Sequence, residues 1–389
     1  MGGTLPVPKL TLRAPARPGP STHAWDDRSG MPRTPVPVPL RVKRSILLTL
    51  ALSATLPLFA IDVDPKLDKA IRASVPVCAG VKLTYEASPM KMPQGFKAVM
   101  VKMEGGRPSC GGQLVAVTSP NGGFFLGQPW PIESDEGNTP EEKLKNFTYR
   151  AMNEPMAVTI ERKANEDGLW PAAVTQTTEA GKLTLSGFVD PAGKVFFFGN
   201  FRRMNADLAA QRSKAFDSFL ASSPVKGKGD ITIVEFSDFQ CPSCKRSSGY
   251  VDPIVKKHAD SVRYVRYDLP LSGHPWAFPA ALAGRAIYRQ KPDLFWDYKK
   301  AVYENQETLS AFMFWDWARN WAEDHDLDLA KYDADLANAE IRAEILKGAG
   351  TAFSNDVRST PTYMVNGVIV DAGDEGKALA EYIEKLLTK

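Results

Sequence analysis

A run of β-branched and aromatic residues, interrupted by one acidic side chain, covers residues 231–237. A short apolar run of this kind predicts a buried strand. Pro242 follows closely and suits the first turn of a helix, because the N–H that proline lacks would have no helical partner there. The pattern therefore predicts a strand-to-helix junction that places Cys241 at the N-terminus of the helix.

Strand and helix patterns continue to the C-terminus. A second β-like run covers residues 262–267, a long helical insertion is predicted at about 275–355, and residues 374–387 predict a closing amphipathic helix. Inside the insertion, aromatic residues recur at helical spacing, which favours packing in a core over a cofactor site. These residues are Phe314, Trp317 and Trp321.

Residues 61–205 predict an α+β domain in which one sequence pattern occurs twice. A hairpin turn followed by an apolar strand that ends in glycine occurs at 119–127 and again at 190–199. Upstream of each copy lies a similar segment, at 95–101 and at 168–174. The repeated pattern has two interpretations: duplication of a small helix-plus-sheet unit, or chance recurrence of strand-turn-strand patterns in an antiparallel sheet.

The N-terminal residues predict export. Residues 31–60 combine a basic stretch with a short apolar core, as in a secretory signal peptide. A bilayer-spanning helix needs about 20 apolar residues, and Pro57 interrupts this shorter run. We expect cleavage after Ala60 and a mature protein in the periplasm or otherwise secreted. Residues 1–30 lack periodicity, so we expect a disordered leader or a misassigned start, with Met31 as the better start.

The net charge and the small number of possible metal ligands argue against two classes of function. The net charge of +3 is spread along the chain, which argues against a nucleic-acid partner. Cys241 and Cys244 enclose Pro-Ser and could form half of a zinc site, but structural zinc usually takes four ligands. The other cysteines are isolated, and after the signal segment only His258, His274 and His325 remain. We therefore favour a redox centre with no metal and no organic cofactor.

Three features support a redox centre. A helix N-terminus favours the thiolate form of Cys241. Glu235 lies six positions earlier, inside an apolar strand where an unused carboxyl group would be costly. Thr360-Pro361 precedes a short β-like run and an Asn366-Gly367 turn. With these motifs in this order, residues 229–389 resemble the DsbA-like branch of the thioredoxin superfamily, whose members are secreted thiol:disulfide oxidoreductases.

The resemblance implies a thioredoxin-like α/β fold and roles for five residues. Cys241 and Cys244 would exchange disulfides with exported proteins, and Glu235 would relay the proton of Cys244. Thr360 and Pro361 would form a cis-proline pair that contacts substrate, and a membrane redox partner would recycle the site. A paired strand carboxylate without a catalytic role is the alternative for Glu235. The Pro-Ser dipeptide departs from the Pro-His of strongly oxidising members, which argues against extreme oxidising power.

The order of the predicted regions is also similar to that of Dsb-type disulfide isomerases. In that family a small cystatin-like dimerisation domain precedes a linker helix and the thioredoxin domain. Residues 206–228 would then form the linker helix and the start of a flexible joint that ends at Gly229. A homodimer through the N-terminal domain would follow, but residues 61–205 are about twice the size of one such domain.

The four cysteines predict a second, structural pair. Exported chains usually oxidise their cysteines, and proximity pairs Cys241 with Cys244, which leaves Cys78 with Cys110. Closing that loop would stabilise the fold by roughly 3–4 kcal/mol. Two unpaired buried thiols are the alternative.

Three functional hypotheses remain open. The first is net oxidation of exported thiols. The second is disulfide isomerisation or reduction by a protein that is held reduced, which an extra N-terminal domain favours. The third is a client-specific binding module with redox-active thiols. The reduction potential of the cysteine pair separates the directions, since about 30 mV shifts the equilibrium by roughly 1.4 kcal/mol.

Overall fold

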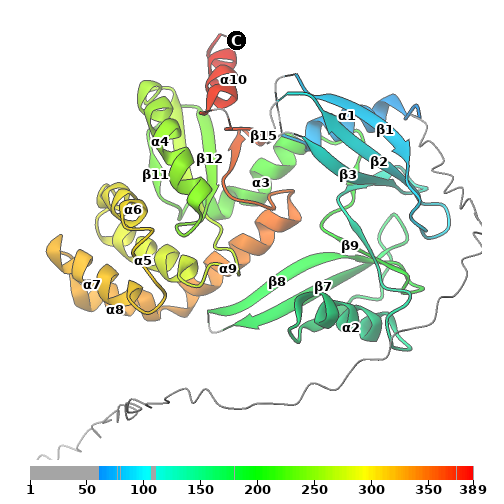
Figure 1. Ribbon diagram of the computed structural model, residues 1–389, viewed down its shortest axis with the longest axis horizontal. Coiled ribbons are helices and arrows are strands. Elements are labelled where there is room, and N and C mark those ends of the chain that lie inside the picture. The colour runs from blue at the N-terminus through cyan, green and yellow to red at the C-terminus, as the bar shows by residue number, and fades with distance from the viewer. Residues whose placement is uncertain are drawn as a thin grey trace, which may run out of the picture. The chain divides into compact units, whose positions relative to one another are not determined.

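The computed structural model describes residues 61–76, 78, 80–106, 111–178, 180–373 and 375–388. These residues belong to one compact unit, Pro57–Lys389. The predicted leader, signal segment and cleavage site lie outside the described residues. Within the described part, three five-stranded sheets organise the chain, two in the N-terminal region and one in the C-terminal domain (Figure 1).

The C-terminal sheet has the strand order β11-β13-β12-β14-β15. The central strands β12 and β13 are parallel, and all other neighbours are antiparallel. The helix α4 connects β12 to β13. The bounds are β11 Val225–Lys226, β12 Ile231–Ser237, α4 Pro242–Lys257, β13 Val262–Asp268, β14 Thr362–Val365 and β15 Val368–Val370.

Helices cover both faces of this sheet because its strands alternate their side chains between two cores. Ile233 packs in the core formed with α4 and α10 Lys377–Leu387. Val234, the next residue, packs in the core formed with α3 Leu208–Leu220 and α9 Ala339–Ser354. The two-sided burial explains why β12 reads as a continuous apolar run.

The predicted helical insertion is confirmed. It contains α5 Ala277–Gln290, α6 Leu294–Glu304, α7 Phe314–Asp324, α8 Leu329–Ala337 and α9. Phe314 is fully buried, and both Trp317 and Trp321 pack against the ring of Tyr298. The aromatic residues at helical spacing therefore form a core.

The N-terminal region consists of two antiparallel sheets with the same plan, drawn in blue-cyan and in green in Figure 1. In each, a helix precedes a four-stranded meander. The first contains α1 Pro65–Ser74, β1 Lys82–Ala87, β2 Lys97–Glu104, β3 Gly112–Thr118 and β4 Gly123–Leu126. The second contains α2 Pro140–Met152, β6 Ala157–Ile160, β7 Trp170–Thr178, β8 Gly181–Val189 and β9 Val195–Phe198.

The two sheets exchange their fifth strands. The segment after β4, β5 Pro129–Pro131, pairs with β9 of the second sheet. The segment after β9, β10 Arg202–Arg203, pairs in turn with β4 of the first sheet. The repeated segments of the sequence lie at equivalent places, at β4 and β9 and at β2 and β7. This plan favours duplication, which stays a proposal, as do the predicted domain boundaries.

The region of the predicted linker helix and flexible joint packs against the C-terminal domain. Phe216 of α3 packs in the core of the C-terminal domain, so α3 is no free-standing linker. Lys226 pairs with Tyr264 in the sheet, and a Cβ on Gly229 would lie 1.9 Å from the carbonyl carbon of Ser261. The glycines of the expected joint therefore allow close packing of the backbone, and the flexible joint itself stays a prediction.

Candidate active site

The strand-to-helix junction forms as predicted. Cys241 is the N-cap residue of α4, and Pro242 occupies the first turn. The preceding turn is held by Asp238, whose carboxylate accepts hydrogen bonds from the backbone N–H groups of Gln240 at 2.6 Å and Leu271 at 2.8 Å. His274 Nδ1 lies 2.8 Å from the same carboxylate. This histidine therefore contacts the carboxylate that shapes the turn.

The two thiols differ in their tendency to ionise. A hydrogen bond from Cys244, with further ones from Thr360 and from the backbone N–H groups of Cys244 and Ser243, outweighs burial and lowers the pKa of Cys241 from 9.0 to about 5. Burial, and then the neighbouring Cys241, raises the pKa of Cys244 well above 9.0. Cys241 therefore has the greater thiolate character of the pair, and the thiolate is the reactive form.

Thr360 and Pro361 lie across from Cys241. The peptide bond between them is cis, and Cys241 Sγ donates a hydrogen bond to the carbonyl oxygen of Thr360 at 3.5 Å. The two segments meet because β14, which begins at Thr362, is antiparallel to β12. The buried Thr360 hydroxyl has no other hydrogen-bond partner within the described part of the chain, so it can donate to the thiolate of Cys241.

Glu235 is completely buried in β12. Burial raises the pKa of this carboxyl group, but the positive charges of Lys299 and Arg266 and a hydrogen bond donated by the Tyr264 hydroxyl outweigh that effect and hold the pKa below its usual range. Its Oε1 accepts no hydrogen bond from any described residue. The charge of Glu235 also contributes to the raised pKa of Cys244.

Comparison with known proteins gives consistent results for this part of the chain. A family model described as Thioredoxin matches residues 226–385. The disulfide bond formation protein D of Bacillus subtilis is 26% identical over 178 residues, which cover 43% of this chain and 78% of that protein. The structure of oxidised BdbD from Bacillus subtilis is 25% identical, with a TM-score of 0.39 over 44% of this chain and 95% of that chain.

Residues 226–385 form a DsbA-like thioredoxin domain. The chain is also similar to the Na(+)/H(+) antiporter NhaA 1 of Mycolicibacterium vanbaalenii, at 30% identity over 149 residues. That match covers 37% of this chain but only 23% of the antiporter. The chain thus spans less than a quarter of the length of this relative.

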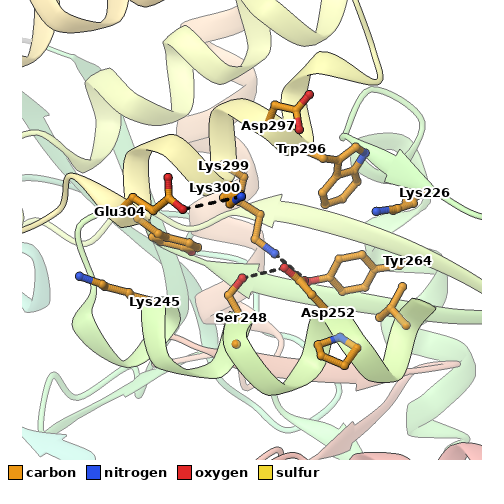
Figure 2. A pocket seen from close by; sticks show the side chains of 14 residues that line it. Lys226, Lys245, Ser248, Asp252, Tyr264, Trp296, Asp297, Lys299, Lys300 and Glu304 are labelled. Atoms are coloured by element: carbon orange, nitrogen blue, oxygen red, sulfur yellow. Dashed lines mark hydrogen bonds and ion pairs between the residues drawn. The ribbon is translucent and has the colours of Figure 1, made fainter. Parts of the chain in front are cut away.

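A cavity of about 530 Å³ in the DsbA-like domain is lined by Lys299, Tyr264 and Asp252, among others (Figure 2). Lys299 Nζ, from α6, lies 3.6 Å from Glu235 Oε2 and 3.4 Å from the Tyr264 hydroxyl. It also donates to Asp252 Oδ1 at 3.0 Å, and the Asp252 side chain is 52% exposed. Polar contacts therefore run without a break from Glu235 to solvent.

A second cavity, of about 600 Å³, opens beside the cysteine motif. It is lined by Pro242, Lys245, Trp276 and Gln306, among others. Gln306 donates to the carbonyl oxygens of Phe239 at 2.8 Å and Cys241 at 3.1 Å. A residue of the helical insertion therefore holds the turn that carries Cys241.

Sequence reasoning missed Lys299 and Gln306. Both come from the helical insertion, and no local motif marks either residue. A buried carboxylate in β12 requires a positively charged partner. The sequence therefore indicates that a basic side chain lies nearby, but it does not identify which one.

The remaining predicted site residues are only partly described. Cys78 is disulfide-bonded, while Cys110 lies outside the described residues, so their pairing stays a prediction. Among the residues that the structure describes, no three or more His, Cys, Asp or Glu side chains are grouped to hold a metal ion. No helix in the same ranges has the length and apolar character needed to cross a membrane.

Proposed function

We propose that this protein is an exported thiol:disulfide oxidoreductase that forms disulfides in protein substrates through Cys241 and Cys244. The observation that carries the proposal is the pKa of about 5 for Cys241 at the N-terminus of α4, beside the Thr360-Pro361 loop. At neutral pH this sulfur is a thiolate, which is both a good leaving group and the form that exchanges disulfides.

In the oxidising direction, a substrate thiolate attacks Cys241 Sγ of the Cys241–Cys244 disulfide. A mixed disulfide forms, and the Cys244 sulfur leaves and takes up a proton. A second substrate thiolate then attacks the substrate sulfur of the mixed disulfide and releases Cys241 as a thiolate. The substrate dithiol is oxidised to a disulfide, and the cysteine pair is reduced. A membrane redox partner would reoxidise the pair.

Glu235 is the proposed proton carrier for Cys244. The raised pKa of Cys244 means that this sulfur must gain a proton when it leaves and lose one when it attacks. Glu235 Oε1 has no hydrogen-bond partner in the described part of the chain and is available to hold that proton. The contacts through Lys299 and Asp252 link the carboxyl group to solvent.

The low pKa of Cys241 supports net oxidation. A stabilised thiolate favours the reduced form of the pair, and this makes the disulfide a stronger oxidant. The name of the disulfide bond formation protein of Bacillus subtilis points in the same direction for that relative. The proposed site of action is the periplasm or another exported location, as the predicted signal segment indicates.

Isomerisation by a protein held reduced is the second candidate, and the two-sheet N-terminal region favours it. Such a region offers a surface that could retain a misfolded client through several attacks. We propose two possible functions for the N-terminal region. It could form a homodimer, or it could bind one specific client protein. In either case the chemistry at Cys241 is the same.

Trapping separates the roles of the cysteines. The Cys244→Ser variant should accumulate mixed disulfides with disulfide-containing substrate proteins, because Cys241 attacks the substrate disulfide and the resolving thiol is missing. Cys241→Ser should form none and should lose thiol oxidation. Ser243→Ala, which alters the motif but keeps both thiols, is the matched control and should behave as wild type. Trapping by Cys241→Ser in place of Cys244→Ser would reverse the assignment.

A further inference from the structure

The segment just before the Thr360-Pro361 loop is tied to the N-terminal region. Asp356 accepts hydrogen bonds from Arg202 at 2.9 Å and from Arg212 at 2.8 Å. Arg202 belongs to β10 of the first N-terminal sheet, and Arg212 belongs to α3. The two arginine side chains are 6% and 1% exposed. An ion pair this well buried holds its partners in one arrangement, because separating them would leave charges without partners.

Arg358 makes a second contact from the same segment. Its Nη2 donates to the carbonyl oxygens of Leu126 at 3.2 Å and of Phe198 at 3.4 Å. These residues end β4 and β9, the equivalent strands of the two N-terminal sheets. Arg358 therefore joins both sheets at matching positions, only two residues before Thr360.

The glycines that follow these strands make room for the arginine. Gly127 and Gly199 have φ angles of +146° and +116°. A Cβ on Gly127 would lie 2.5 Å from Arg358 Nη1, whereas one on Gly199 would lie 3.4 Å from Arg358 Nη2. Any side chain at position 127 would push Arg358 away from the strand ends.

We propose that Asp356 and Arg358 are positioning residues that fix the Thr360-Pro361 loop on the N-terminal region, so that this region controls how an extended substrate chain lies beside Cys241. The inference rests on the proposed function. This role differs from client binding by the N-terminal surface. Here the N-terminal region affects the substrate only by holding the Thr360-Pro361 loop, without contacting the substrate itself.

Turnover of two substrates by the full mature chain tests the inference. The protein substrate is reduced ribonuclease A, which is turned over with oxidised glutathione as the terminal oxidant. The small substrate is reduced glutathione, whose single-turnover reduction of the Cys241–Cys244 disulfide is measured without a terminal oxidant. Arg358→Ala should raise KM for ribonuclease about five- to tenfold, the size expected for the loss of one or two hydrogen bonds. Its kcat and its rate with glutathione should stay within about twofold of wild type, and Arg358→Lys should give an intermediate KM.

Gly127→Ala approaches the same contact from the other side. It should raise KM as Arg358→Ala does, and the double variant should be no worse than either single variant, because both remove one interaction. Gly112→Ala is the matched control: its φ of +149° is close to that of Gly127, but its Cβ would meet only Met103 Cε, at an ordinary contact distance of 3.8 Å. This control should keep the wild-type KM. Thermal melting confirms that each variant is folded.

Three outcomes overturn the inference: a wild-type KM in Arg358→Ala, equal losses with both substrates, or additive effects in the double variant. Failure of the proposed function gives a different result. In that case the wild-type chain itself would oxidise neither substrate, or would do so without Cys241.

Discussion

Asp190 of the N-terminal region and Glu235 of the DsbA-like domain are both buried, but their carboxyl groups are held in different ways. In the N-terminal region, a buried carboxylate such as Asp190 accepts hydrogen bonds from backbone N–H groups of its own turn, those of Ala192, Lys194 and Val195. In the DsbA-like domain, Glu235 lies inside a strand with charged partners and one oxygen without a hydrogen bond in the described chain. Buried charge that completes a turn is structural, whereas buried charge left incomplete beside a thiol indicates chemistry.

The apolar cores show the same contrast. The N-terminal sheets are joined by an aromatic cluster in which Phe197 contacts Phe96, Phe125 and Phe201. In the DsbA-like domain, Cys241 and Cys244 belong to the core that contains Trp276 and Phe314 of the insertion. Packing in the first region holds sheets together, and packing in the second also sets the surroundings of the thiols.

The largest expected effect is on ionisation in the DsbA-like domain. The rate of alkylation of Cys241 by iodoacetamide should rise with a midpoint near pH 5, about four units below the usual value of 9.0. Cys244→Ala should move this midpoint upward, because the hydrogen bond from Cys244 is the main cause of the low pKa. A midpoint near pH 9 in the wild type would remove the basis for an activated thiolate.

The same shift predicts a pH-dependent stability of the reduced protein. The native pKa of Cys241 lies below that of the unfolded thiol, so the unfolded state binds more protons between pH 5 and pH 9. Stability of the reduced form should therefore rise with pH across that window and fall as pH drops through 5. The oxidised form, which has no thiol at position 241, is the control and should lack this contribution.

The next effect should be confined to the N-terminal region. Phe197→Ala removes a fully buried ring and should lower the free energy of unfolding by about 3–5 kcal/mol. The alkylation rate of Cys241 should stay unchanged while the protein is folded. Phe197→Leu keeps more of the volume and should recover part of the loss. A changed midpoint of Cys241 alkylation in Phe197→Ala would show that packing of the N-terminal sheets affects the ionisation of Cys241.

A smaller effect is expected for proton transfer. Glu235→Gln keeps the shape of the side chain but cannot carry the proton, so resolution by Cys244 should slow on the order of 10²-fold at neutral pH. Stopped-flow decay of a mixed disulfide measures that step, and the thermal melt checks the fold. Equal resolution rates in variant and wild type would leave Glu235 with a purely structural role.

Features set by neighbouring residues were predictable from the sequence. The junction at Cys241, the buried acid in β12 and the helical insertion follow from short apolar runs and from the place of Pro242. Lys299, Gln306 and Arg358 were not predictable, because each reaches its partners through tertiary packing across long stretches of chain. The glycines at 227 and 229 do not decide between the two roles from sequence, since glycine serves close packing as well as flexibility.

Strand exchange shows the same limit in the N-terminal region. The repeated pattern in the sequence identified β4 and β9 as similar strands, but β5 and β10 are only three and two residues long. Segments this short carry almost no periodicity. Their pairing with the opposite sheet was therefore not predictable from the sequence.

The reduction potential of the Cys241–Cys244 pair, measured by equilibration with glutathione, tests the central claim most directly. A thiolate with a pKa of about 5 and a Pro-Ser dipeptide should place it between protein disulfide isomerase and DsbA, at about −180 to −120 mV. A value at or below that of thioredoxin, about −270 mV, would contradict net disulfide formation and indicate a reductase.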